Sequence, residues 1–192
     1  MRIGVIAAQG AFIEHIALLR RLGAEAFPIR LPRELEKIEG LIIPGGESTT
    51  ISKLMLAYKL SDEICNLAKK GIPIWGTCAG MILLANEITD SNKVEPLGLM
   101  DIRVKRNAFG RQRESFETGL AIPVLGKKAF PGVFIRAPLI EQVKSGEILA
   151  RLDDGTIVAA RQGNLLASSF HPELTNDTRF HKYFLDIVGG CN

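Results

Sequence analysis

The chain has no long hydrophobic run. Among its 192 residues the longest uninterrupted apolar stretches are five residues, at 54–58 and 81–85, whereas a membrane-spanning helix needs about 18 to 20. Gln9 interrupts the apolar residues near the N-terminus before they reach the roughly seven that a secretory signal requires. We therefore expect no membrane span, no export and a cytoplasmic protein.

Cysteine is scarce, and neither sign of charge dominates. Cys65, Cys78 and Cys191 are odd in number and lack C-x-x-C spacing, which argues against a disulfide framework or a zinc site and for a reducing compartment. The 24 basic and 21 acidic side chains leave a net charge of +3. Basic residues gather only within 103–113, where Phe109 is the one interleaved aromatic, so we expect no nucleic-acid partner and no metal.

Nucleotide-binding loops are also missing. The sequence contains no G-x-x-x-x-G-K-[ST], and no G-x-G-x-x-G follows its first strand-like segment, so we expect no cofactor. Internal repeats, low-complexity tracts and linker-like segments are absent as well. A chain of this length without them is expected to be one domain covering residues 1–192.

The first half of the chain alternates strand-like and helix-like patterns. Apolar residues run from Ile3 to Ala8 and then recur at helical spacing up to Gly23. The alternation continues with a strand at 40–43, a helix at 49–59, a helix capped by Ser61, a strand at 74–76 and a helix from about 79. Alternation with buried-type strands indicates a parallel sheet covered by helices on both faces.

The second half is rich in short strand-like runs separated by turn residues. They lie at 97–106, 115–122, 132–136, 147–152, 156–160 and 165–169. Such runs predict antiparallel additions to the sheet. A final helix with an apolar stripe at 180, 184, 187 and 188 closes the chain. The predicted fold class is therefore α/β, with a mixed, largely parallel central sheet.

The pentapeptide Gly76-Thr77-Cys78-Ala79-Gly80 lies between a strand and a helix. Glycines two residues before and after a nucleophile allow the tight strand-to-helix turn that lifts a reactive side chain above a sheet. A thiol at a helix N-terminus also ionises more readily. The alternative is that Cys78 is a small buried hydrophobe, and the pentapeptide alone does not decide between the two.

His171 is the histidine best placed to move protons for a nucleophile. It follows the strand-like run at 165–169, so it should emerge at the same carboxyl edge of the sheet as Cys78. Glu173, two residues further on, can orient the imidazole. His15 and His181 stand one residue away from apolar helical stripes, and we interpret both as surface or flanking residues without a catalytic role.

The segment Pro44-Gly45-Gly46-Glu47-Ser48 joins a strand to a helix. Adjacent glycines let backbone N–H groups point at an anion, either a phosphate or the oxyanion of a tetrahedral intermediate. The alternative is an ordinary helix start with Ser48 or Thr49 as the N-cap.

In their order and places, PGGES, GTCAG and FHPE together resemble the class I (triad) glutamine amidotransferase family. The segments RNAFGRQ, SFE and FIRAP, with Gln9-Gly10, narrow the resemblance to the PdxT/SNO family, the glutaminase subunits of pyridoxal 5′-phosphate synthase. The resemblance runs over essentially the whole chain. It implies a three-layer, flavodoxin-like fold.

The resemblance also implies roles for individual residues. Cys78 would attack the carboxamide of L-glutamine, His171 would move the protons and Glu173 would hold His171. The oxyanion hole would be the backbone N–H groups of Gly46 and Ala79. The glutamine contacts would be Gly46, Glu47, Ser48, Arg106, Ile135 and Arg136. Arg106 and Arg136, expected on strands, can neutralise a carboxylate, whereas Arg103, Lys105 and Arg113 suit a solvated basic face.

A partner follows from the same resemblance. It would be a separate (β/α)8-barrel synthase subunit that receives ammonia through an internal path and makes pyridoxal 5′-phosphate from ribose 5-phosphate and glyceraldehyde 3-phosphate. Three alternatives stay open on the residues. They are a class I glutaminase serving another acceptor, such as an imidazole glycerol phosphate synthase, a cysteine peptidase or stress protein of related architecture, and a binding module in which Cys78 is structural.

Overall fold

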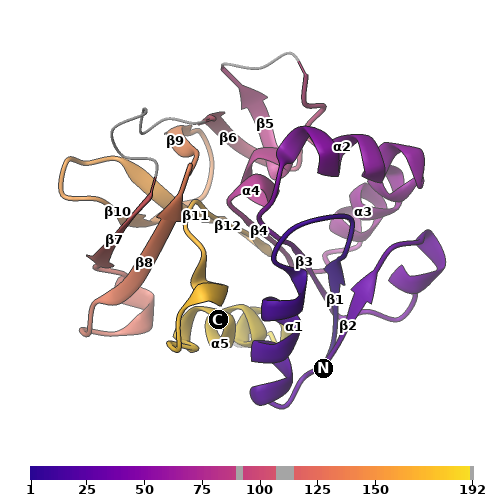
Figure 1. Ribbon diagram of the computed structural model, residues 1–192, viewed down its shortest axis with the longest axis horizontal. Coiled ribbons are helices and arrows are strands. Elements are labelled where there is room, and N and C mark those ends of the chain that lie inside the picture. The colour runs from indigo at the N-terminus through magenta and orange to yellow at the C-terminus, as the bar shows by residue number, and fades with distance from the viewer. Residues whose placement is uncertain (90–92, 107–114, 191–192) are drawn as a thin grey trace.

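The computed structural model describes residues 1–89, 93–106 and 115–190 (Figure 1). The strands are β1 (Arg2–Ile6), β2 (Glu25–Ile29), β3 (Gly40–Ile43), β4 (Ile74–Thr77), β5 (Ala85–Ile88), β6 (Met100–Lys105), β7 (Ser115–Leu120), β8 (Phe130–Ile135), β9 (Leu139–Val143), β10 (Glu147–Arg151), β11 (Ile157–Gln162) and β12 (Leu165–Ser168). The α-helices are α1 (Phe12–Arg21), α2 (Ser48–Ala57), α3 (Leu60–Lys69), α4 (Ala79–Leu84) and α5 (Arg179–Val188). Short 3₁₀ helices are η1 (Pro32–Leu35), η3 (Pro123–Leu125) and η4 (Pro172–Leu174).

One mixed sheet forms the centre of the molecule. Its strand order is β2-β1-β3-β4-β12-β11-β9-β6-β5, and β10 pairs with β11. The neighbours from β2 to β12 run parallel, whereas the pairings of β11 with β12, β9 and β10 and of β9 with β6 are antiparallel. The predicted parallel sheet with antiparallel additions is confirmed.

Helices cover both faces of this sheet, as Figure 1 shows. On one face α2, α3 and α4 pack apolar side chains such as Ile51 and Ile64 into a buried cluster. On the other face α1 and α5 do the same with Leu19, Phe180 and Phe184, and the rings of Phe180 and Phe184 meet that of Trp75 of β4. Strands buried on both faces carry the nearly unbroken apolar runs seen in the sequence. The predicted three-layer architecture is confirmed.

Strands β7 and β8 form a separate two-stranded sheet and, within the described ranges, pair with no strand of the central sheet. The expectation that 115–122 and 132–136 extend the central sheet is therefore wrong. The hairpin instead buries Phe130 and Phe134, whose rings meet that of Phe170, on the α5 side of the molecule. It also bonds the chain just after β12, because the N–H of His171 donates to the carbonyl of Val133.

Several expected boundaries are corrected by local geometry. Helix α3 begins after Lys59, which takes a left-handed φ of 57°, and Ser61 lies inside the helix instead of capping it. Helix α4 is only six residues long because strand β5 starts directly at Ala85. Strands β2, β5 and β9 were not expected. Pro28 lies within β2 and Glu141 within β9, so neither run has a clear strand pattern.

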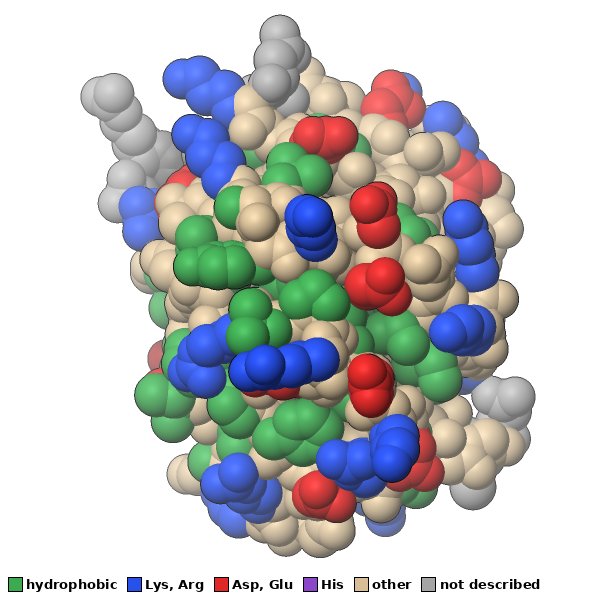
Figure 2. All heavy atoms as spheres, turned by 90° about the vertical axis from the view of Figure 1, so that its right-hand side faces the viewer, with side chains coloured by type: hydrophobic (Ala, Val, Ile, Leu, Met, Phe, Trp, Pro, Cys, Tyr) green, Lys and Arg blue, Asp and Glu red, His purple; other side chains and the backbone are tan. Residues whose placement is uncertain are grey.

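The outer surface carries charges of both signs. On the face drawn in Figure 2, Lys and Arg side chains alternate with Asp and Glu side chains and with small apolar areas. Within residues 1–89, 93–106 and 115–190, no helix combines the length and the apolar character that crossing a membrane requires.

Candidate active site

Three loops meet at the carboxyl edge of three neighbouring parallel strands. Strand β4 lies between β3 and β12, with Gly76 opposite Ile43 and Thr77 opposite Ser168. All three strands therefore end at the same edge. Gly45-Gly46 follows β3, Cys78 follows β4 and His171 follows β12. This confirms the prediction that Cys78 and His171 emerge at one edge of the sheet.

Cys78 occupies a strained turn between β4 and α4. Its φ of 48° and ψ of −104° lie outside the regions that residues with a Cβ prefer. The turn is held by the N–H of Cys78, which donates to the carbonyl of Ser168 over 2.7 Å. Gly80 lets α4 approach β3, since a Cβ on Gly80 would lie 1.9 Å from the carbonyl oxygen of Ile43. This is the geometry expected of a nucleophile elbow.

His171 lies between Cys78 and Glu173. Its Nδ1 is 2.7 Å from Oε1 of Glu173, and its side chain lines the same cavity as Cys78. Burial alone would lower the pKa of His171, but the hydrogen bonds with Cys78 and Glu173 outweigh it and raise the pKa to about 10. The imidazole is therefore a cation at neutral pH, next to the sulfur.

His15 and His181 lie beneath this group, and their interpretation as surface or flanking residues is wrong. Both side chains are fully buried. Nδ1 of His15 is 2.9 Å from Nε2 of His181, and Nε2 of His15 is 3.4 Å from Oε2 of Glu173. Helices α1 and α5 bury wide arcs over the sheet, and the rings of His15 and His181 meet each other and that of Trp75, so the residue beside each apolar stripe is also inside.

A cavity of about 340 Å³ opens in front of Cys78 and His171. Its lining comes from six separated parts of the chain. The lining residues are Gln9, Gly46, Glu47, Ser48, Cys78, Ala79, Ile82, Arg106, Ile135, Arg136, Pro138 and His171. Every residue expected to contact glutamine or to form the oxyanion hole is among them, and Glu173 lies behind His171.

Glu47 lines the cavity and also immediately precedes the first residue of α2. Its carboxylate caps α2 by accepting from the N–H groups of Thr49 and Thr50, so the alternative of Ser48 or Thr49 as the N-cap is wrong. Glu47 takes the cap because its backbone is extended just before the first helical residue. The Thr50 hydroxyl first, and then these N–H groups, lower the pKa of Glu47 to about 2.

The two arginines that line the cavity each lie one residue beyond the end of a strand. The sequence predicts them as the last residues of those strands. Arg106 follows β6, and its Nη2 is 3.8 Å from Oε1 of Glu47. Arg136 follows β8 with a strained φ of 42°. Arg103 lies outside the cavity lining and pairs with Glu87 and Glu141. The exposed Lys105 is likewise no lining residue. Arg113 and residues 107–112 of the RNAFGRQ segment lie outside the described residues.

The Gly45-Gly46 loop is held from the side by the loop that follows β1. The carbonyl of Gly45 accepts from the N–H of Ala11 over 3.3 Å, and Oε1 of Gln9 accepts from the N–H of Glu47 over 2.8 Å. In a trans peptide the N–H opposes the carbonyl, so the N–H of Gly46 points away from Ala11. A Cβ on Gly45 would lie 2.5 Å from Cε1 of His171. This loop therefore lies directly against the His171 ring.

Sequence reasoning missed Gln9, Ile82 and Pro138 as lining residues. Gln9 follows the carboxyl end of a parallel strand, and Ile82 lies one helical turn after Cys78, so position alone points to both. Pro138 lies within the FIRAP segment. Within the described part of the chain, no group of three or more His, Cys, Asp or Glu side chains is arranged to hold a metal ion.

Comparison with known proteins gives a consistent result. The model of the SNO glutamine amidotransferase family matches residues 5–189. A protein of Dehalococcoides mccartyi named pyridoxal 5′-phosphate synthase subunit PdxT is 60% identical over 190 residues, covering 98% of this chain and 97% of the relative. A protein of the same name from Herpetosiphon aurantiacus is 59% identical over 191 residues, covering 97% of this chain and all of the relative.

Solved structures show the same similarity. A crystal structure described as a glutamine amidotransferase superposes with a TM-score of 0.91 at 50% identity, covering 97% of this chain and 98% of the other. The PurLQS structure from Thermotoga maritima gives a TM-score of 0.71 at 17% identity, covering 100% of this chain and 99% of that chain, and shows the fold alone.

Proposed function

The chain belongs to the SNO glutamine amidotransferase family, and from that premise we propose that it hydrolyses L-glutamine with Cys78, His171 and Glu173 and delivers the ammonia to a pyridoxal 5′-phosphate synthase. The observation that carries the proposal is the position of His171. It hydrogen-bonds Glu173 and shares with Cys78 a cavity lined by all the expected glutamine contacts. A sulfur, a proton carrier and a carboxylate in series are the parts that covalent acyl transfer needs.

The first half of the proposed reaction forms a thioester. Cys78 attacks the carboxamide carbon of glutamine as the thiolate, the nucleophilic form of a cysteine, beside the cationic imidazole of His171. The carbonyl oxygen becomes an oxyanion facing the N–H groups of Gly46 and Ala79. Ala79 is the first residue of α4, so its N–H has no acceptor within the helix. The C–N bond then breaks, His171 gives its proton to the leaving nitrogen, and ammonia departs.

The second half returns the enzyme to its starting state. His171 is now neutral and removes a proton from water, and the resulting hydroxide attacks the thioester carbon. The C–S bond breaks and releases glutamate, which leaves the thiolate of Cys78 beside the imidazolium of His171. The new carboxyl group loses its proton to solvent, so the sum is glutamine plus water giving glutamate, ammonia and one proton. Glu173 accepts the hydrogen bond from Nδ1 of His171 and stabilises the two cationic stages.

The charges on the cavity wall match the two charged groups of free glutamine. The guanidinium groups of Arg106 and Arg136 are suited to the α-carboxylate. The carboxylate of Glu47, ionised because of its low pKa, is suited to the α-ammonium group. Ser48 is buried in the wall, and Ile135 completes the contacts. This arrangement favours a free amino acid over an internal residue of a peptide, which lacks both end charges.

We assign the ammonia to a synthase partner because the 57–60% identical relatives are named as subunits of pyridoxal 5′-phosphate synthase. The partner would be the (β/α)8-barrel subunit, which would receive ammonia through an internal path and combine its nitrogen with ribose 5-phosphate and glyceraldehyde 3-phosphate. A hetero-oligomeric complex protects ammonia from loss to water. A cytoplasmic location fits such a complex.

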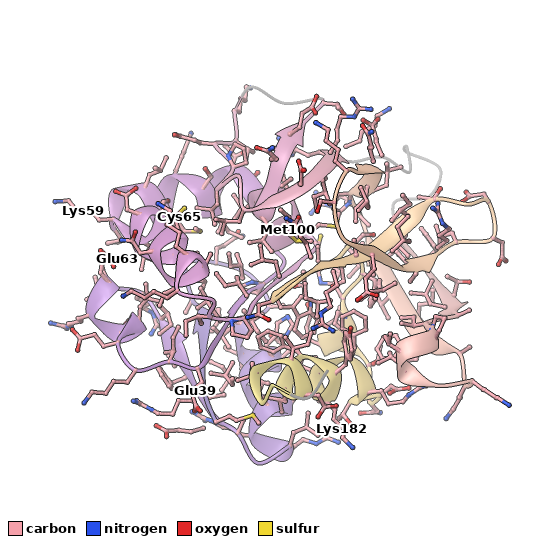
Figure 3. The ribbon with its side chains drawn as sticks, turned by 180° about the vertical axis from the view of Figure 1, so that it is seen from behind. Glu39, Lys59, Glu63, Cys65, Met100 and Lys182 are labelled. Carbon is pink, nitrogen blue, oxygen red and sulfur yellow. The ribbon has the colours of Figure 1, made fainter. Side chains whose placement is uncertain are left out.

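The test is glutamate release from glutamine, with and without the synthase subunit. We expect release by the wild type that Cys78→Ala abolishes, because no other group supplies the covalent route. Cys65→Ala is the matched control, because Cys65 lies on α3 (Figure 3) and does not line the cavity. Its sulfur is 3.8 Å from the Leu97 carbonyl. The Cys65→Ala variant should release glutamate like the wild type. Release that survives Cys78→Ala, or stimulation by an imidazole glycerol phosphate synthase subunit instead, would contradict the proposal.

A further inference from the structure

The carboxylate of Glu173 has two oxygens in different surroundings. Oε1 receives the 2.7 Å bond from Nδ1 of His171. Oε2 is buried and, within the described chain, has no partner in good hydrogen-bond geometry. Its polar neighbour is Nε2 of His15, 3.4 Å away. A buried carboxyl oxygen without a donor costs free energy, so an N–H donated by the His15 ring would stabilise Glu173.

The hydrogen-bond partners of the two buried histidines determine which nitrogens carry protons. Burial first, and then the neighbouring His181 and His171, hold the pKa of His15 well below its ordinary value, so the ring is neutral. Burial likewise lowers the pKa of His181 to about 3. Each ring therefore has one N–H.

Only one arrangement leaves neither N–H without an acceptor. His181 donates from Nε2 to Nδ1 of His15 over 2.9 Å, and His15 donates from Nε2 between Oε2 of Glu173 and Oγ1 of Thr77, each 3.4 Å away. Nδ1 of His181, which has no partner in the described chain, is then a bare acceptor. The opposite arrangement would bury an unpaired N–H on His181 and turn a lone pair of His15 toward a carboxylate.

We propose that His15 is a positioning residue for the triad, donating from Nε2 to Oε2 of Glu173 and so keeping Oε1 directed at His171. The proposal rests on the proposed role of the triad. Glu173 is in the short helix η4, next to the loop that leads into α5, whereas His15 comes from α1. The ring of His15 is itself fixed edge-on against Trp75 of β4. Glu173 is thus held from a second, rigid part of the fold.

The first test is a double-mutant cycle in the complex with the synthase subunit. His15→Leu keeps the ring's apolar volume but removes the donor, and should lower kcat about 10- to 100-fold, the range of one hydrogen bond to a charged group, while KM changes little. His15→Gln, which can present an N–H at the same place, should recover much of the loss. In a Glu173→Gln background His15→Leu should cost no further activity. An additive loss would show a role in folding alone and overturn the proposal.

The second test does not need glutaminase activity and separates this inference from the proposed function. The ring signals of His171 are followed by NMR against pH in the full chain. The groups facing His171 are Cys78, Glu173 and, behind them, His15 and His181, and Glu47, Arg106 and Arg136 share its cavity. If His15 positions Glu173, His171 loses its proton at a lower pH in His15→Leu and near the wild-type pH in His15→Gln. An unchanged titration of His171 in a folded His15→Leu variant overturns the proposal. This outcome does not depend on which substrate the enzyme hydrolyses.

Discussion

Two residues of the cavity, Cys78 and Arg136, hold positive φ angles although neither is glycine. Such conformations cost of order 1 to 3 kcal/mol each and persist only where the surroundings determine them. Around Cys78 those surroundings are the hydrogen bond to Ser168 and the contact between Gly80 and β3. The strain therefore lies where the proposed chemistry needs a side chain lifted into the cavity.

Substitutions of His171 and Glu173 should differ in size. His171→Asn removes the group that moves protons, and loss of general acid–base catalysis alone costs ~10²- to 10⁴-fold in kcat. Glu173→Gln removes only the group that orients and stabilises the imidazole, so it should cost less and should shift the upper limb of the pH profile to lower pH. Equal, small losses in steady-state glutamate release would remove the triad assignment.

The Glu47 cap gives a pH-dependent contribution to stability. The folded-state pKa is about 2, below the ordinary 4.5, so the stabilisation is complete above about pH 4.5 and fades as the pH falls toward 2. At neutral pH Glu47→Ala should cost about 0.5 to 1 kcal/mol, the lower part of the N-cap range, because the side chain is half exposed. Urea unfolding at several pH values measures this difference, and a constant difference from pH 7 to pH 2.5 would contradict it.

The catalytic candidates could be predicted because each lies in a short motif at the end of a strand, where the motif restricts the backbone to few conformations. His15 and His181 could not be predicted in the same way. A helical stripe identifies the centre of a buried face, not its width, and these two residues stand at the margin of that face. Their significance depends on two helices, distant in sequence, that pack together over β4.

At the scale of elements, the β3–α2 loop is expected to control the oxyanion hole. The structure has the carbonyl of Gly45 turned to Ala11, one of two orientations that the Gly45-Gly46 peptide can take, since glycine has access to both signs of φ. We predict that turning the N–H of Gly46 toward or away from the oxyanion lets the synthase subunit switch hydrolysis on. One such N–H is worth ~10²- to 10³-fold in rate.

Gly46→Ala should restrict this movement, and its Cβ would also crowd Oε1 of Gln9 at 3.0 Å. The substitution should then strongly reduce partner-stimulated glutamate release at saturating glutamine. Its effect on the free energy of unfolding should be small by comparison. Gly119→Ala, in β7 with its Cβ at 3.3 Å from that of Ala129, is the control. Wild-type release that is already full without the partner would contradict a switched oxyanion hole.

Elements with a clear pattern were predictable, and those set by tertiary pairing were not. The apolar runs of β1, β3 and β4 specify buried parallel strands whatever their neighbours. The runs that became β7 and β8 also predict strands, but nothing in them says that they pair with each other instead of joining the sheet. That choice depends on Phe130 and Phe134, which find their buried place against Phe170 and α5.

In the whole molecule, the cavity combines residues from both sheets. The parallel half of the central sheet supplies Gly46, Cys78 and His171 from three adjacent strand ends, whereas the arginines that line the cavity follow β6 of the central sheet and β8 of the separate hairpin. The alternation of patterns along the chain predicted the first half well. That residues 1–192 act as one domain, in the cytoplasm and with a synthase partner, stays a prediction.

The assignment of Cys78 as the nucleophile is tested most directly by identifying the residue that a glutamine analogue modifies. The complex with the synthase subunit is treated with a diazo-ketone analogue of glutamine, and its peptides are mapped by mass spectrometry. We predict modification of Cys78 alone, prevented by excess glutamine and lost in Cys78→Ala, with Cys65 and Cys191 unmodified. Glutamine-protected modification of Cys65 or Cys191 with Cys78 untouched would contradict it.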